Sequence, residues 1–233
     1  ALNRGLFRRA AGITAVSAWL GDALVHLGLC RSYAVVPNVV PGLERALPLA
    51  GTPGHYLMVA DLVDRTKNVS GVLRALAQAC EHNASLQLRI IGDGPDRAQL
   101  EELCDALGLR ERVRFLGRLP NSAVLDHMAG AFAVIINSNV ETFSVVTGEA
   151  LAQGKPVIAT RCGGPIAFLT QANGLLIPVG DEAALKQAML QLVEQAGQYR
   201  PDTIRASVSE RFSYAAVGAA FVKEYQHILQ RDA

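Results

Sequence analysis

The chain has 233 residues, half of them hydrophobic and 18% charged, so it can bury the core of a sizeable globular domain. Its 22 basic and 21 acidic side chains leave a net charge of +1, which provides no field to attract nucleic acid or an acidic membrane surface. No apolar run approaches the roughly 20 residues that a membrane-spanning helix needs. The cysteines have no zinc-site spacing, and we expect reduced, mostly buried thiols in a cytosolic protein: Cys30, Cys80, Cys104 and Cys162.

The chain begins with Ala1 rather than Met, lacks the apolar run of a signal peptide and enters structured sequence at once. We therefore take it for a fragment of a longer protein. Residues before about 38 predict one helix–strand–helix piece, which does not complete a domain by itself.

Short apolar runs alternate along the chain with segments of helical period. Most of the runs are continuously apolar, as expected for strands that are covered on both faces. The predicted strands are residues 13–17, 34–37, 56–60, 86–91, 112–116, 133–137, 156–160 and 175–178.

Four segments carry apolar residues at helical spacing. Pro95 and Gly108 limit one of them, and Asp181 can cap another. The Pro- and Gly-rich segment 40–55 is either a linker or a surface loop. Regular strand–helix alternation predicts an α/β fold, a doubly wound, Rossmann-like parallel sheet. The predicted buried helix faces are Val69, Val72, Leu73 and Leu76; Leu100, Leu103, Cys104 and Leu107; Leu185, Ala188, Met189 and Leu192; and Phe221, Val222, Tyr225 and Ile228.

The most informative loop runs from residue 138 to 150, where a ligand would sit at the carboxyl end of a parallel strand. Glu141 and Glu149 stand eight positions apart, and the amides near 143–146 form a helix N-terminus, which attracts phosphate. The two carboxylates can bracket a ligand of roughly 10 Å, which suits a nucleoside diphosphate sugar. The alternative is a pair of solvated glutamates beside a helix start.

Three further loops offer weaker evidence. Lys67 is expected at a helix start, where a cation opposes the helix dipole unless an anion binds nearby; the alternative is an exposed lysine without a partner. Gly92 and Gly94 precede a helix, but Arg97 replaces the third glycine of the dinucleotide fingerprint, which counts against an NAD enzyme. We expect these two glycines to allow a tight turn and close backbone approach to a ligand. The paired glycines 163–164 either present amides to an anion or form a plain turn.

Taken in order, these segments resemble the C-terminal, donor-binding domain of GT-B-fold retaining glycosyltransferases, most closely glycosyltransferase family 4. The resemblance covers nearly the whole chain and rests on residues 35–38, 67–69, 88–95, 113–117, 141–149, 154–160 and 173–176. It implies that residues 1–37 end an N-terminal acceptor domain and its linker. Residues 38–233 would form the donor domain with a C-terminal crossover helix.

The resemblance also implies roles for single residues. Glu141 would contact the donor sugar near the reacting carbon, and Lys67 would neutralise the β-phosphate; these two would be the catalytic residues. Glu149 would bind the ribose. The diphosphate would meet the backbone amides of Thr142, Phe143, Ser144 and Val145, and the base would lie near Arg118 and Leu119.

Three positions depart from the family pattern. Asp61 stands where the family commonly has an arginine, so either Arg65 substitutes for it or the loop points elsewhere. Ala167 replaces a glutamate. Ser144 replaces a glycine, which would narrow the sugar pocket.

The expected function is transfer of a sugar, with retention, from a UDP- or GDP-sugar, without cofactor or metal. The acceptor would be a glycan or lipid-linked saccharide of surface polysaccharide synthesis, bound mainly by the absent N-terminal domain, so the fragment alone should be inactive. The full enzyme would be cytoplasmic, at the inner membrane face, with no nucleic acid partner and no transmembrane segment. The alternatives are a nucleotide-sugar 2-epimerase and a binding or scaffold module without activity. The Glu141–Glu149 spacing favours the transferase over the epimerase.

Overall fold

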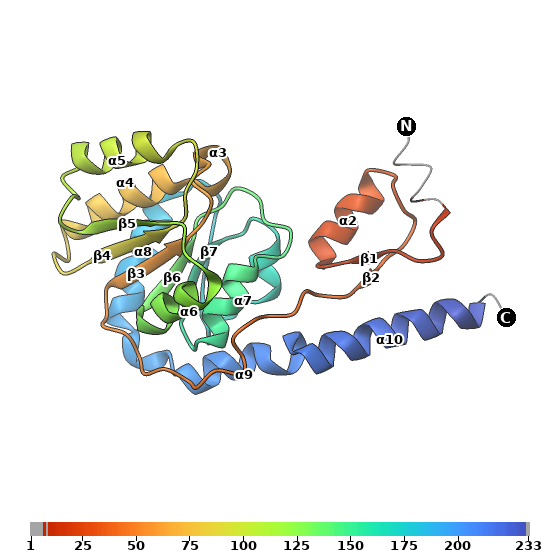
Figure 1. Cartoon of the computed structure of the whole chain (residues 1–233). Coiled ribbons are helices and arrows are strands. Elements are labelled where there is room, and N and C mark those ends of the chain that lie inside the picture. The colour runs from red at the N-terminus through yellow and green to blue at the C-terminus, as the bar shows by residue number, and fades with distance from the viewer. Residues whose placement is uncertain (1–6, 8, 232–233) are drawn as a thin grey trace.

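The computed structural model describes residue 7 and residues 9–231, and its main part is a six-stranded parallel sheet (Figure 1). The strands are β3 (His55–Val59), β4 (Gln87–Ile91), β5 (Val113–Gly117), β6 (Ala133–Ile136), β7 (Val157–Thr160) and β8 (Gly174–Ile177). Their spatial order is β5-β4-β3-β6-β7-β8. The chain adds β4 and β5 on one side of β3 and β6, β7 and β8 on the other, so the strand order reverses between β3 and β6. Such a switch point is where open α/β sheets bind ligands.

The central strands are covered on both faces, as their continuous apolar sequences predict. Every residue of β6 and β7 is buried, and β7 pairs in register with β6 and β8. Each predicted strand overlaps an observed one, and the predicted doubly wound α/β class is confirmed.

Helices pack on both faces of the sheet. On one side α4 (Val69–Cys80) packs against α5 (Arg97–Ala106) and α8 (Glu182–Glu194). On the other, α7 (Val145–Ala152) packs against α6 (Asn121–Gly130) and α9 (Pro201–Phe212) (Figure 1). Short helical turns complete this part: α3 (Asp64–Lys67), η1 (Gly164–Ala167) and η2 (Ala196–Gln198).

The predicted helix faces are confirmed for α4 and α8, whose predicted apolar residues are all buried. The Asp181 side chain caps α8, since its Oδ1 accepts a hydrogen bond of 2.8 Å from the Ala184 amide. The face of α5 is confirmed in part: Leu100 and Cys104 are buried, whereas Leu103 and Leu107 are half-buried. Helix α9 was not predicted as a separate element.

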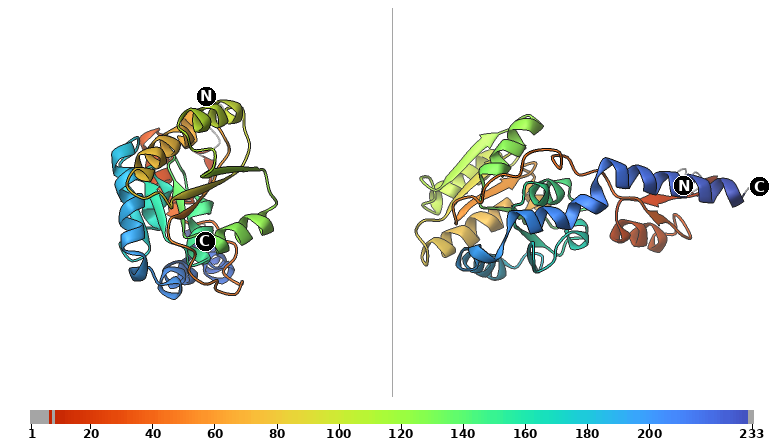
Figure 2. Two further views of the ribbon diagram at one scale, coloured as in Figure 1. Left: turned by 90° about the vertical axis from the view of Figure 1, so that its left-hand side faces the viewer. Right: turned by 90° about the horizontal axis from the view of Figure 1, so that it is seen from below.

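The prediction for the last helix, α10 (Tyr214–Arg231), is wrong about burial. Phe221, Val222 and Tyr225 are 39%, 55% and 63% exposed, and Ile228 is half-buried. The reason is that α10 leaves the sheet domain and runs past a small N-terminal unit instead of packing on a core (Figures 1 and 2).

This N-terminal unit comprises β1 (Thr14–Ala15), α2 (Ala18–His26) and β2 (Ala34–Val35), with the two strands parallel. The first helix of the predicted helix–strand–helix piece falls largely outside the described residues. Ser17 connects the unit to the sheet domain, donating a hydrogen bond of 2.6 Å to the Thr142 carbonyl.

Segment 40–55 is a surface loop held against the sheet domain by side chains from other parts of the chain. The Lys155 ammonium donates to the Leu49 carbonyl at 2.7 Å, and Gln153 donates to the Gly42 carbonyl at 3.2 Å. These bonds fix the loop along the edge of the domain, which favours the surface-loop interpretation over the linker.

Candidate functional site

A cleft of about 300 Å³ opens at the carboxyl ends of β3, β4 and β6, at the switch point of the sheet. Helix α7 begins at its wall. Eight of the residues singled out in the sequence line it: Asp61, Lys67, Gly92, Arg118, Leu119, Glu141, Ser144 and Val145. The topology therefore gathers loops that are far apart in the chain.

Lys67 and Glu141 form an ion pair in this cleft. The Lys67 Nζ lies 2.6 Å from Glu141 Oε1, and the Ser138 hydroxyl donates to the same oxygen at 2.8 Å. The side chains of Lys67 and Glu141 are only 24% and 17% exposed, so water screens the pair incompletely.

The predicted dipole conflict at Lys67 does not exist. Asn68 has a left-handed conformation (φ +48°) and separates α3 from α4, so Lys67 lies in the last turn of α3 rather than at the start of α4. A cation is favourable at a helix C-terminus. Its anionic partner in the protein is Glu141.

The N-terminus of α7 forms the wall next to this pair. Ser144, at φ +68°, is the cap residue, but its hydroxyl bonds to the Thr147 hydroxyl (2.8 Å) and not to a backbone amide. The amides of Val145 and Val146 consequently find no acceptor within residues 9–231. Unpaired amides at a helix start attract anions.

Phe143 and Thr142 support this wall without lining the cleft. The Phe143 ring is buried against Phe168 and Phe212, with centroids 4.9 Å and 5.8 Å away. Thr142 is exposed, and its carbonyl accepts a hydrogen bond from the Ser17 hydroxyl.

Glu149 lies one turn further along α7 and is 4% exposed. Burial raises the pKa of its carboxyl, and the Asn121 amide, which donates to Oε1 at 2.9 Å, partly offsets this by lowering the pKa. Asn121 was not singled out in the sequence. The sequence feature that could have identified it is its position directly after Pro120, at the start of the helix that follows the segment expected to bind the base.

The glycines of the β4–α5 loop make close backbone contacts, and these are with the protein itself. A Cβ on Gly92 would lie 1.8 Å from the Ala60 carbonyl oxygen, and one on Gly94 would lie 2.5 Å from the Leu62 carbonyl oxygen. Gly94 does not line the cleft, and Gly92 does. Both glycines let the β3–α3 and β4–α5 loops pack side by side.

Asp61 stands at the mouth of the cleft and faces Arg118, with 4.0 Å between the carboxylate and the guanidinium. Arg65 is exposed and lies outside the lining. The loop geometry thus places Arg118, and not Arg65, opposite the carboxylate that replaces the family's arginine.

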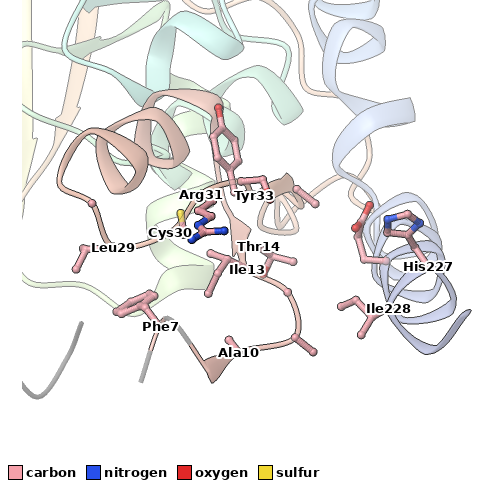
Figure 3. A pocket seen from close by; sticks show the side chains of 16 residues that line it. Phe7, Ala10, Ile13, Thr14, Leu29, Cys30, Arg31, Tyr33, His227 and Ile228 are labelled. Atoms are coloured by element: carbon pink, nitrogen blue, oxygen red, sulfur yellow. The ribbon is translucent and has the colours of Figure 1, made fainter. Parts of the chain in front are cut away.

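A larger cavity, of about 840 Å³, lies between the N-terminal unit and α10 (Figure 3). Arg31 and Tyr33 line it from one side and His227 and Ile228 from the other. The N-terminal unit and α10 form this cavity, and no strand of the six-stranded sheet ends in it. The cleft beside α7 is therefore the candidate functional site.

The sequence profile described as glycosyl transferases, group 1, matches residues 43–209. The chain belongs to the group 1 glycosyltransferases. The matched range includes every residue of the cleft. Together with the solved structures below, it identifies the sheet domain as the C-terminal domain of a GT-B glycosyltransferase.

Curated relatives and solved structures agree with this assignment. The chain is 34% identical over 220 residues to the lipopolysaccharide core biosynthesis glycosyltransferase LpsD of Rhizobium meliloti, covering 89% of this chain and 62% of LpsD. The apo structure of the lipopolysaccharide outer core galactosyltransferase WaaB has a TM-score of 0.80 at 24% identity, over 96% of this chain and 63% of WaaB. HepE of Anabaena in complex with UDP has a TM-score of 0.83 at 20% identity, over 97% of this chain and 66% of HepE.

No helix among the described residues is both long and apolar enough to span a membrane. The same part of the chain brings no three His, Cys, Asp or Glu side chains close enough together to hold a metal ion.

Proposed function

We propose that this domain binds a nucleotide-sugar donor and that the full-length enzyme transfers the sugar with retention. The observation that carries the proposal is the cleft in which Lys67, Glu141 and the free amides of α7 meet. A cation and oriented amides are the groups that stabilise a departing nucleoside diphosphate without a metal.

In this proposal each part of the cleft meets one part of the donor. Lys67 and the Val145 and Val146 amides hold the diphosphate, and Glu141 exchanges its bond to Lys67 for bonds to sugar hydroxyls. Glu149 accepts from the ribose, and the base lies against Arg118 and Leu119.

The relatives support the choice of ligand and pathway. The HepE structure contains UDP, and LpsD is named for lipopolysaccharide core biosynthesis. We therefore propose a UDP- or GDP-sugar as donor, a glycan or lipid-linked saccharide as acceptor, and work at the cytoplasmic membrane face. Membership of family 4 within the GT-B enzymes is part of the same proposal.

The chain spans about three fifths of the length of LpsD. We propose that the acceptor binds mainly to the part of the enzyme outside this chain, so the isolated chain binds donor without transferring sugar.

The test is calorimetric titration with UDP, GDP and ADP, using the wild-type chain and Lys67→Ala. One nucleotide should bind selectively, and Lys67→Ala should weaken it about tenfold or more, which corresponds to roughly 1.4 kcal/mol. Lys223→Ala, an exposed lysine on α10, is the matched control and should bind like the wild type.

Absence of binding by all three nucleotides to well-folded protein would overturn the proposal. It would favour the scaffold alternative, in which the exposed carboxylate of Asp61 repels the diphosphate.

A further inference from the structure

The Glu149 carboxylate has one hydrogen-bond partner within the described chain, and that partner comes from another helix. Asn121 is the first residue of α6 and is exposed, and its amide reaches the buried carboxylate at 2.9 Å. Glu149 Oε2 has no partner in the same range, and it is not sealed from solvent. Oε1 is thus held by the protein, and Oε2 remains able to accept a hydrogen bond from a ligand.

Asn121 and Glu149 are not among the residues that line the cleft, but each lies one helical turn from a residue that does. Val124 follows Asn121 by one helical turn, and Val145 precedes Glu149 by one turn; both valines line the cleft. Residues that are three or four apart in a helix share a face, so Asn121 and Glu149 lie on the same helix faces as these two lining valines, directly behind the cleft.

Capping does not explain the Asn121 side chain. The cap residue of α6 is Pro120, and no side chain caps this helix. The hydrogen bond to Glu149 is the one bond that the Asn121 side chain makes within residues 9–231. The amide therefore serves the carboxylate and not its own helix.

We propose that Asn121 is a positioning residue for ribose recognition: it holds Glu149 Oε1 and so directs Oε2 toward the 2′,3′-diol of a nucleoside diphosphate. This inference rests on the proposed function, since it specifies how the same cleft selects a ribonucleotide. A carboxylate held by one amide loses rotational freedom before the ligand arrives, so less entropy is lost when the diol binds.

The hydrogen bond also bears on the charge of Glu149. Burial favours the protonated carboxyl, and donation from Asn121 favours the carboxylate. An ionised acceptor makes the stronger bond to a hydroxyl. Removing the Asn121 amide therefore weakens diol recognition both by freeing the carboxylate and by making its proton harder to remove.

The experiment compares the tightest-binding of UDP, GDP and ADP with its 2′,3′-dideoxy analogue in calorimetric titrations. The wild type should prefer the ribonucleotide by about ten- to a hundredfold, the effect of losing a hydrogen bond to a charged group. Asn121→Ala should weaken the ribonucleotide about tenfold and leave the dideoxy analogue nearly unchanged, so the preference falls about tenfold. Asn121→Asp keeps the shape without the donor and should lower the preference as well.

Ser122→Ala is the matched control, because Ser122 is the exposed neighbour on the same helix start, and it should keep the wild-type preference. If Asn121→Ala weakens both nucleotides equally, or changes neither, the positioning role is overturned and the donor site stands. If no ribonucleotide binds the wild type, the proposed function fails and this inference fails with it.

Discussion

At the residue scale, Glu149 is the clearest case of a side chain whose burial lowers the stability of the folded protein. It is 4% exposed, receives a single hydrogen bond and has no cationic partner among the groups that shift its pKa. A buried carboxylate of this kind costs folding free energy. Functional sites are where such costs are found.

The raised pKa of Glu149 fixes the direction of a pH effect. A carboxyl whose pKa is raised by folding binds its proton more tightly in the folded protein. Its contribution to stability is therefore fully present in acid, below the pKa of the unfolded chain, and is lost as the pH rises through the folded pKa. Glu149→Gln should raise Tm by about 2–4 °C near pH 7.5, equivalent to about 1 kcal/mol.

This gain should shrink toward about pH 4, where the wild-type carboxyl is protonated in the folded state. Calorimetric scans of both proteins across this range are the measurement. Glutamine retains the acceptor for Asn121, so that bond is not the variable. A Tm difference that stays constant with pH would contradict the argument.

Part of the cleft could be predicted at this scale, since Lys67 and Glu141, which both line it, were singled out from loop position and spacing, whereas Glu149 lies outside its lining. What could not be predicted is which groups they contact. Lys67 and Glu141 are 74 positions apart, and Asn121 and Glu149 are 28 apart. Only the packed sheet brings the members of each pair together.

At the element scale, the loop after β7 holds the loop that carries Glu141. The Glu141 amide donates to the Cys162 carbonyl at 2.9 Å, and the Gly164 amide donates to the Glu141 carbonyl at 2.7 Å. Gly163 lies between them at φ +114°, where a Cβ would be 2.4 Å from the Glu141 carbonyl oxygen and 2.8 Å from Trp19 Cδ2. The paired glycines 163–164 thus lie in close contact with the Glu141 backbone and the Trp19 ring.

Gly163→Ala should displace both neighbours and destabilise the chain by about 1–3 kcal/mol. Because Trp19 is the single tryptophan, its fluorescence reports on this contact directly, and its emission should shift to longer wavelength. Denaturant titration and emission spectra are the measurements. Gly197→Ala is the matched control, since a Cβ there meets no atom within 4 Å, and unchanged emission in both variants would refute the contact.

At the scale of the whole molecule, one core serves the sheet domain. The buried hydrophobic cluster runs from Val40 to Phe212. It includes no buried residue of α10 or of the N-terminal unit within the described chain, although Val16 packs against its edge. These two peripheral parts project together from one side of the sheet domain (Figure 2).

A chain of residues 38–213 should therefore fold by itself, with cooperative unfolding and a Tm within roughly 5 °C of the full chain. Far-UV circular dichroism with thermal melting measures this. A chain of residues 38–200, which lacks α9 and its buried Ile204, Val208 and Phe212, is the contrasting variant and should melt without cooperativity. Loss of cooperative melting in 38–213 would show that the N-terminal unit or α10 is required.

The sequence by itself determined the succession of strands, the buried faces of α4 and α8, the fold class and the loops that meet at the cleft. These depend on local apolar patterns and on residues such as Asp181 that act on their own helix. The tertiary structure alone decided the strand order, the Lys67–Glu141 and Asn121–Glu149 contacts and the exposure of α10. The physical reason is that apolar spacing shows which face of a helix can be buried, whereas packing decides whether any surface is there to cover it.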